Sequence, residues 1–195
     1  MSETNIVTTA ATLVERAGAR LPPRCLPGAL LSLGLSGAAL AYAGVEVQVV
    51  GRDLRARHRG ADGGHLGWEV VVPPRTPAER PRYYYHGTAK GLFRTPPGRC
   101  ERLVLSDGPL PSLLRLSHDL AAGRGVGTCY AAAGGSWTSV AEAALEALLR
   151  RGRISAVELD FGPHANGRTA EARVLVALAR HPRVDVARHG LVGRP

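Results

Sequence analysis

Two aspartates, each placed at the end of an apolar run, are the residues of this sequence best suited to chemistry. Asp107 follows the run 103–105, Asp160 ends the run 154–159, and a glycine stands within two positions of each. Oxygen atoms from such a pair suit Mg²⁺, which prefers a few carboxylates together with water and phosphate. A bound Mg²⁺ would polarise a phosphodiester. The alternative is that both residues only form turns, in which Asp and Gly are favoured.

Alternating strands and helices are expected to position these aspartates. The pattern predicts strands at 103–105, 127–132, 154–159 and 184–187, and helices at 112–122, from 139 onward and at 169–179. Strands that alternate with helices at this spacing imply βαβ units and a parallel sheet. Because the carboxyl ends of parallel strands share one edge, Asp107, Asp160 and the glycine turn at Gly134-Gly135 are expected along that edge, where ligands usually bind.

The first half of the chain has a different pattern. Segments 46–50, 68–72 and 83–85 predict strands of a small antiparallel sheet, and the segment from Gly28 to about Leu40 predicts a buried helix. The proline-containing stretch 96–99 is the expected boundary. We therefore expect a helical and small antiparallel-sheet region at residues 1–98 and an α/β domain at residues 99–195.

The uncharged segment 25–45 has a second interpretation. Several arginines precede it and the tripeptide 41–43 resembles a cleavage site, so a signal peptide or a membrane span is an alternative. Pro27, the glycines of the segment and the acidic residues of its long leader favour the buried helix. We therefore expect no membrane segment.

The charge balance favours a polyanionic partner. The formal net charge is +9, and Lys90 is the only lysine. A basic surface attracts DNA or RNA first, through release of counterions; a basic protein without a nucleic-acid role is the alternative. Cys25, Cys100 and Cys129 lie far apart and form neither a CxxC pair nor a zinc set, which favours a reduced, cytoplasmic location.

Protein kinases and the glycine-loop nucleotide-binding proteins are excluded, because the sequence lacks the other motifs of these classes. The tripeptide 160–162 spells the kinase metal motif, but the chain lacks the glycine-rich loop, the lysine-bearing strand and the catalytic loop of kinases. The glycines at 123, 125 and 127 fit neither a dinucleotide fingerprint nor a P-loop.

From about Trp68 to Ala179 the sequence resembles the Toprim domain, the metal-binding fold shared by topoisomerases and bacterial-type primases. The nearest branch is that of Toprim-like proteins of plasmids and conjugative elements, often found near relaxases. The order and spacing of six segments carry the resemblance, at 67–69, 87–94, 102–110, 127–130, 134–137 and 156–160. The resemblance implies an α/β fold with a parallel sheet flanked by helices, DNA or RNA as ligand, Mg²⁺ as cofactor, and protein partners of a plasmid transfer or replication complex.

Two departures from the family pattern bear on activity. The family has a glutamate, its general acid or base, where this chain has Asp107, and an Asp-x-Asp motif where Asp160 is followed by Gly162. The resemblance thus implies Asp107 as catalytic residue and metal ligand, and Asp160 as metal ligand, in a degenerate site with weak Mg²⁺ binding. His164 or Asn166 could replace the missing ligand in part.

Three basic residues, Lys90, Arg94 and Arg168, are expected to contact nucleic acid, although Lys90 could equally be a solvated surface lysine. The tyrosines 83–85 could stack on single-stranded bases, or lie half in the core and half on the surface. Two functions follow. One is a protein of a mobile element that binds or processes nucleic acid, with Mg²⁺-dependent phosphoryl transfer. The other is a catalytically inactive, Toprim-derived DNA-binding or assembly module.

Overall fold

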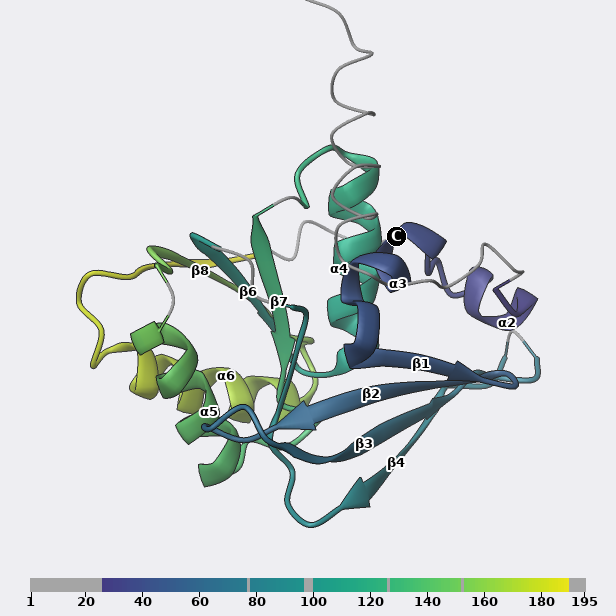
Figure 1. Cartoon of the computed structure of the whole chain (residues 1–195), viewed down its shortest axis with the longest axis horizontal. Helices are drawn as coiled ribbons and strands as arrows, with labels where there is room; N and C mark the ends of the chain where they lie inside the picture. The colour runs from purple at the N-terminus through teal and green to yellow at the C-terminus, as the bar shows by residue number, and fades with distance from the viewer. Residues whose placement is uncertain (1–25, 77, 97–99, 126, 152, 190–195) are drawn as a thin grey trace, which may run out of the picture.

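The computed structural model describes residues 26–76, 78–96, 100–125, 127–151 and 153–189, so Cys25 and the amphipathic start of the chain lie outside it. The described strands form one nine-stranded sheet in the order β4-β3-β2-β5-β7-β6-β8-β9, with β1 beside β2 (Figure 1). The strands are β1 Val47–Val50, β2 Asp53–Arg59, β3 His65–Val72, β4 Arg82–Gly87, β5 Leu92–Arg94, β6 Arg102–Ser106, β7 Thr128–Ala132, β8 Ala156–Asp160 and β9 Asp185–Arg188. The helices are α2 Gly28–Leu31, α3 Gly37–Ala43, the short 3₁₀ helix η1 Gly44–Glu46, α4 Pro109–Ala121, α5 Ser139–Arg151 and α6 Ala165–Leu178.

The second half of the sheet is parallel, as the alternation of strands and helices predicts. Strands β7, β6, β8 and β9 lie side by side and all pair in parallel. Ser106 at the end of β6 is the register partner of Asp160 at the end of β8. The carboxyl ends of these strands therefore meet at one edge, where the two aspartates were expected.

The first half of the sheet is antiparallel and continues into the second. The three-residue strand β5 pairs with β2 on one side and with β7 on the other, so the sheet passes the expected boundary near residue 98 without a break. The division into regions 1–98 and 99–195 stays a prediction. Strand β2 runs through an arginine-rich segment to which the sequence pattern assigned no strand. Its alternate residues Leu54, Ala56 and His58 are buried, which explains why this charged segment forms a strand.

The prediction of one continuous buried helix from Gly28 to about Leu40 is wrong. The structure has α2 and α3 instead, separated at Gly34, whose φ of 89° lies in a region that glycine adopts readily. Ser36 then caps α3, because its side-chain oxygen accepts the backbone N–H of Ala39 at 3.1 Å. Among the residues that the structure describes, no helix has the length and apolar character needed to cross a membrane.

Two hydrophobic cores lie on opposite faces of the sheet, because alternate side chains of a strand point to opposite sides. Leu103, Leu105 and Leu159 face α5 and α6, whereas Val104 and Tyr130 face α3 and α4. Figure 1 shows these two helix pairs on either side of β6, β7 and β8. This packing fixes the strands whose ends carry the candidate site.

Candidate functional site

Asp107 and Asp160 lie at the carboxyl edge of the parallel strands. Asp107 directly follows β6, and Asp160 is the last residue of β8, opposite Ser106. Their side chains are 12% and 29% exposed. The expectation that they share one edge is confirmed, and both carboxylates are within reach of solvent.

The carboxylate of Asp107 is held by the segment that follows β8. Its Oδ2 accepts the backbone N–H of Gly162 at 3.3 Å and lies 2.7 Å from Nε2 of His164. The other ring nitrogen of His164, Nδ1, accepts the backbone N–H of Gly167 at 3.0 Å. Nδ1 is therefore engaged as an acceptor, and the other ring nitrogen is the one at ion-pair distance from Asp107. His164 is thus both the N-terminal cap of α6 and a close neighbour of the Asp107 carboxylate.

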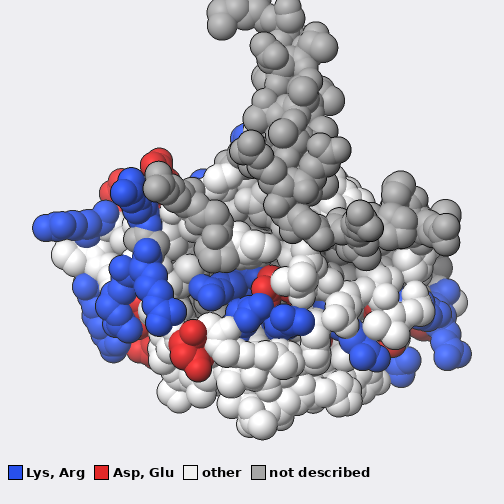
Figure 2. Space-filling view, viewed as in Figure 1, with Lys and Arg blue, Asp and Glu red and all other residues white. Residues whose placement is uncertain are grey.

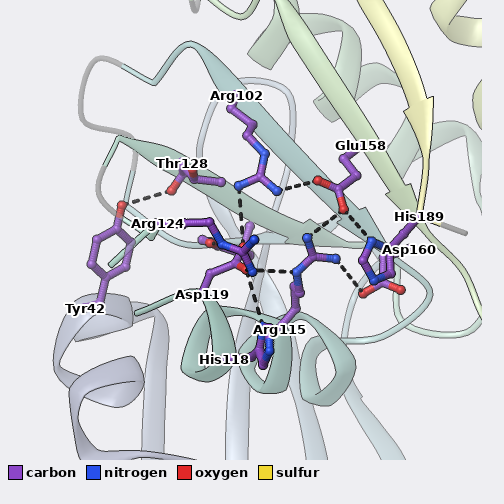
Figure 3. Close-up of polar contacts among 11 residues, drawn as sticks. Tyr42, Arg102, Arg115, His118, Asp119, Arg124, Thr128, Glu158, Asp160 and His189 are labelled. Atoms are coloured by element: carbon purple, nitrogen blue, oxygen red, sulfur yellow. Dashed lines mark hydrogen bonds and ion pairs between the residues drawn. The ribbon is translucent and has the colours of Figure 1, made fainter. Parts of the chain in front are cut away.

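Asp160 faces a cation of the chain itself. Its Oδ2 lies 3.7 Å from Nη1 of Arg115, a residue of α4. Arg115 belongs to a set of ionic and hydrogen-bonded side chains that we call the charge network, formed by Arg102, Arg115, Asp119, Tyr130 and Glu158. Figure 3 shows Arg115 between Asp119, Glu158 and Asp160. The guanidinium group of Arg115 thus lies next to the carboxylate of Asp160 on the side of α4.

These contacts bear on the expected magnesium ion. Within the described ranges, no group of three or more His, Cys, Asp or Glu side chains is arranged to hold a metal ion. One oxygen of Asp107 accepts the N–H of Gly162 and lies at ion-pair distance from His164, and Asp160 faces Arg115, whereas Mg²⁺ requires free oxygen ligands in a nearly octahedral arrangement. In this arrangement the donors present do not fit a magnesium site.

A second polar cluster, buried and missed by the sequence reasoning, lies beside this edge. The Oε2 of Glu69 lies 3.2 Å from Nε2 of His58 and 3.3 Å from Nζ of Lys90, and the side chains of Glu69 and His58 are 3% and 0% exposed. His58 directs Nδ1 to the carbonyl oxygen of Gly91 at 2.8 Å, so Nδ1 carries a proton. Attraction between Nε2 and Oε2 then requires one further proton on either atom. We call Glu69, His58 and Lys90 the buried triad.

The turn at Gly134-Gly135 joins the buried triad to Asp107. The φ of Gly134 is 68°, and a β-carbon at this position would overlap the carboxylate of Glu69. The backbone N–H of Gly135 donates to the carbonyl oxygen of Asp107. The pKa of Tyr83 is raised, first by burial and then by the negative charges of Glu69 and Asp107. Both carboxylates therefore act on the same tyrosine hydroxyl.

The three predicted nucleic-acid contacts have different positions. Lys90 lies at the candidate site, where its Nζ pairs with Glu69 and its backbone carbonyl accepts the hydroxyl of Thr138 at 2.7 Å. Arg168 is exposed in the first turns of α6, and its guanidinium donates to the carbonyl of Pro163. Arg94 is not brought to this edge, because its guanidinium lies beside Gly63 in the turn between β2 and β3.

Basic side chains are also common on the surface around the site. Figure 2 shows Lys and Arg side chains in clusters from the α5–α6 side across the middle of the molecule, with fewer acidic side chains between them. This agrees with the formal net charge of +9.

The fold is similar to the catalytic cores of primases. The Aquifex aeolicus primase (zinc-binding and RNA polymerase domains) matches with a TM-score of 0.53 and 13% identity, over 96% of this chain and 55% of that one. The chain thus spans about half the length of that primase structure. A DnaG catalytic core matches with a TM-score of 0.51 and 14% identity, over 94% of this chain and 71% of that one.

A third match comes from the structure of bacteriophage T7 lagging-strand DNA polymerase interacting with primase domains bound to an RNA/DNA hybrid and dTTP. Its TM-score is 0.51 at 18% identity, over 84% of this chain and 79% of that one. No protein-family model and no curated protein matches the sequence. At these identities the likeness concerns the fold, and the chain has a Toprim-like α/β fold of the kind found in primase catalytic cores.

Proposed function

We propose that this chain binds DNA or RNA along the carboxyl edge of β6 and β8, as a Toprim-derived binding module. The observation that carries the proposal is that Asp107 and Asp160 each face a donor of the chain itself, His164 and Arg115. Such contacts favour a binding edge over a metal centre. The primase-like fold supports nucleic acid as the ligand, since the similar T7 primase domains are bound to an RNA/DNA hybrid.

Phosphate contacts are assigned to Lys90 and Arg168. The side chain of Lys90 is 24% exposed at the triad side of the edge, and Arg168 is exposed at the start of α6. Cations placed so contribute to affinity through counterion release. Arg94 belongs to β5 and its guanidinium lies beside Gly63 in the β2–β3 turn, so a contact with nucleic acid there would fall outside this edge. A role in a mobile element, with protein partners from a transfer or replication complex, is part of the proposal and has its support in the sequence resemblance.

Fluorescence anisotropy with labelled DNA and RNA tests this function. The double variant Lys90→Gln, Arg168→Gln is expected to weaken binding and to reduce the slope of log affinity against log salt by about 0.7 to 0.9 for each lost contact. Arg183→Gln is the matched control, because it removes an exposed arginine in the turn after α6. An affinity that does not change with salt concentration would refute phosphate contact.

Metal-dependent processing of nucleic acid is the second candidate function. It is favoured by the position of Asp107 and Asp160 on neighbouring strand ends. Calorimetric titration with Mg²⁺ separates the two candidates: we expect no saturable binding at millimolar metal, and weak binding in His164→Ala, in which Oδ2 of Asp107 is released. Saturable binding by the unmodified protein that Asp107→Asn abolishes would favour processing instead.

A further inference from the structure

The face of β2, β3 and β4 that points away from α3 and α4 carries aromatic and basic side chains that the carboxyl edge does not use. We call it the outer sheet face, formed chiefly by Arg55, Arg57, Trp68, Arg82, Tyr84 and His86. The strand register places these residues in rows: Arg57, Trp68 and His86 are successive partners, as are Arg55, Val70 and Tyr84. In Figure 1, α2 and α3 lie on the opposite side of these strands.

The arginines of the outer sheet face have unused hydrogen-bonding capacity. Among the described residues, the buried Nε atoms of Arg55 and Arg57 have no hydrogen-bond partner. The guanidinium of Arg57 lies 4.9 Å from the centre of the Trp68 ring, a cation–π contact that restrains it. The pKa of the adjacent His65 is lowered, first by burial and then by the positive charges of Arg57 and Arg59. At His65 the charges of Arg57 and Arg59 thus outweigh that of Glu46, which acts in the opposite direction.

The aromatic rings of the same face are accessible. Tyr84 is 47% exposed, and Trp68 is half-buried one residue pair away on the neighbouring strand. Diagonal neighbours of this kind lie about 7 to 8 Å apart, within reach of one continuous ligand. A shallow depression of about 470 Å³ lies between them, lined by Arg55, Trp68, Tyr84 and His86 among others. Rings and cations on a sheet surface are the pattern by which several sheet proteins hold unpaired bases.

We propose that the outer sheet face binds a single-stranded nucleic acid, with bases stacked on Tyr84 and Trp68 and phosphates on Arg55, Arg57 and Arg82. Charge complementarity identifies the occupant, because three arginines share this face with one aspartate, Asp53. Stacking selects a single strand, because the base faces of a duplex are covered by neighbouring bases. The inference rests on the proposed function for the class of ligand, but it assigns a different surface and a different form of nucleic acid.

Trp68 provides a direct readout. The chain has two tryptophans, so the variant Trp137→Phe leaves Trp68 as the only one. Addition of an oligothymidylate is expected to quench its emission, and duplex DNA of the same length is expected to quench it much less. In the full chain, Tyr84→Ala should weaken oligothymidylate binding roughly ten-fold through lost stacking. Arg82→Gln should lower the salt slope by about 0.7. Arg183→Gln, away from this face, is the matched control.

The outcomes distinguish this inference from the function proposed above. If Tyr84→Ala and Arg82→Gln bind as the control does while Lys90→Gln, Arg168→Gln is impaired, the outer sheet face is not a binding surface and the carboxyl edge stands. If the unmodified protein binds no nucleic acid, both proposals fail. If Trp68 emission changes with protein concentration alone, a second copy of the chain covers the face, which overturns the inference. If Trp137→Phe fails to fold, the fluorescence anisotropy of a labelled oligothymidylate, measured with the protein that keeps both tryptophans, replaces Trp68 emission as the measure of binding.

Discussion

The charge network and the buried triad contain the same kinds of side chains, but both carboxylates of the network accept hydrogen bonds, whereas the contact between His58 and Glu69 in the triad is not a hydrogen bond. Among the described residues, Nη1 of Arg115 is the network atom that is buried without a hydrogen-bond partner. In the network, Asp119 accepts the hydroxyl of Tyr130 at 2.8 Å and Nε of Arg115 at 3.1 Å, and Glu158 lies 2.6 Å from Arg115 (Figure 3). In the triad, Nε2 of His58 and Oε2 of Glu69 approach within ion-pair distance without a hydrogen bond, and Nζ of Lys90 lies at ion-pair distance from the same oxygen, 3.3 Å away.

This difference separates a structural cluster from a functional candidate. A buried polar cluster whose carboxylates are held by several donors stabilises one arrangement of the elements around it. A buried polar atom without a partner costs free energy, so its retention requires an explanation such as a ligand or a proton-transfer role. The network joins α4 to β6 and β8, whereas the triad lies beside the Gly134-Gly135 turn, which donates a hydrogen bond to the carbonyl oxygen of Asp107. The two clusters should therefore respond differently to mutation.

The largest effect is expected from Arg115→Met, which removes the central cation of the network. Arg115 is 10% exposed and Asp119 fully buried, so the variant leaves a buried carboxylate with fewer partners. We expect a loss of about 3 kcal/mol in the free energy of unfolding, measured by urea denaturation. Arg183→Met, at an exposed position, should change it by less than about 0.5 kcal/mol. A loss below about 1 kcal/mol for Arg115→Met would show that the network is not structural.

An intermediate effect is expected from Gly134→Ala, next to the triad. The variant combines a positive φ with overlap against Glu69, for a loss of about 2 kcal/mol in the free energy of unfolding. Gly135→Ala is the matched control, because its φ is also positive, at 74°, and no atom lies within 4 Å of the added carbon. It should cost about 1 kcal/mol. Combining Gly134→Ala with Glu69→Ala should reduce the difference, and the remainder is expected from Cε of Lys90, which lies 2.5 Å from the added carbon. Equal losses in the two single variants would contradict the overlap.

The smallest effect is expected from a change of pH, because protonation of the network's carboxylates alters the free energy of unfolding only in acid. Burial raises the pKa of Asp119, but the hydroxyl of Tyr130 and the guanidinium of Arg115 outweigh it and lower the pKa below its ordinary value. Burial also raises the pKa of Glu158, but the guanidinium groups of Arg102 and Arg115 outweigh it and lower this pKa below its ordinary value. Because both folded pKa values lie below the unfolded ones, near 4, this stability is complete above that pH and is lost as pH falls through the folded values.

Urea denaturation at several pH values checks this sign. The free energy of unfolding should change little between pH 7 and pH 5 from these groups and fall below about pH 4. In Arg115→Met the fall should be shallower, because the shifts of both carboxylates are reduced. A steeper fall in the variant would contradict the assignment of the network to acid-dependent stability.

Much of the framework was predictable because it depends on local patterns. The alternation of strands and helices after residue 102 predicts the parallel sheet, and the rule of shared strand ends correctly predicts that Asp107 and Asp160 lie on one edge. Glu69 and His58 could not be assigned a role, because Glu69 looks like an ordinary strand residue and His58 lies in an arginine-rich segment to which the pattern assigned no strand. Strand β2 pairs antiparallel with β3, which brings the two buried side chains together.

The sequence by itself determined the alternation of strands and helices after residue 102, the two aspartates at strand ends and the glycine turn between them. These features follow from the periodicity of neighbouring residues, which the backbone imposes locally. Only the tertiary structure decided the partners of the carboxylates: His164 for Asp107, Arg115 for Asp160, and His58 with Lys90 for Glu69. The physical reason is that hydrogen bonds and ion pairs depend on distances of a few ångströms between residues far apart in the chain, which no local pattern encodes.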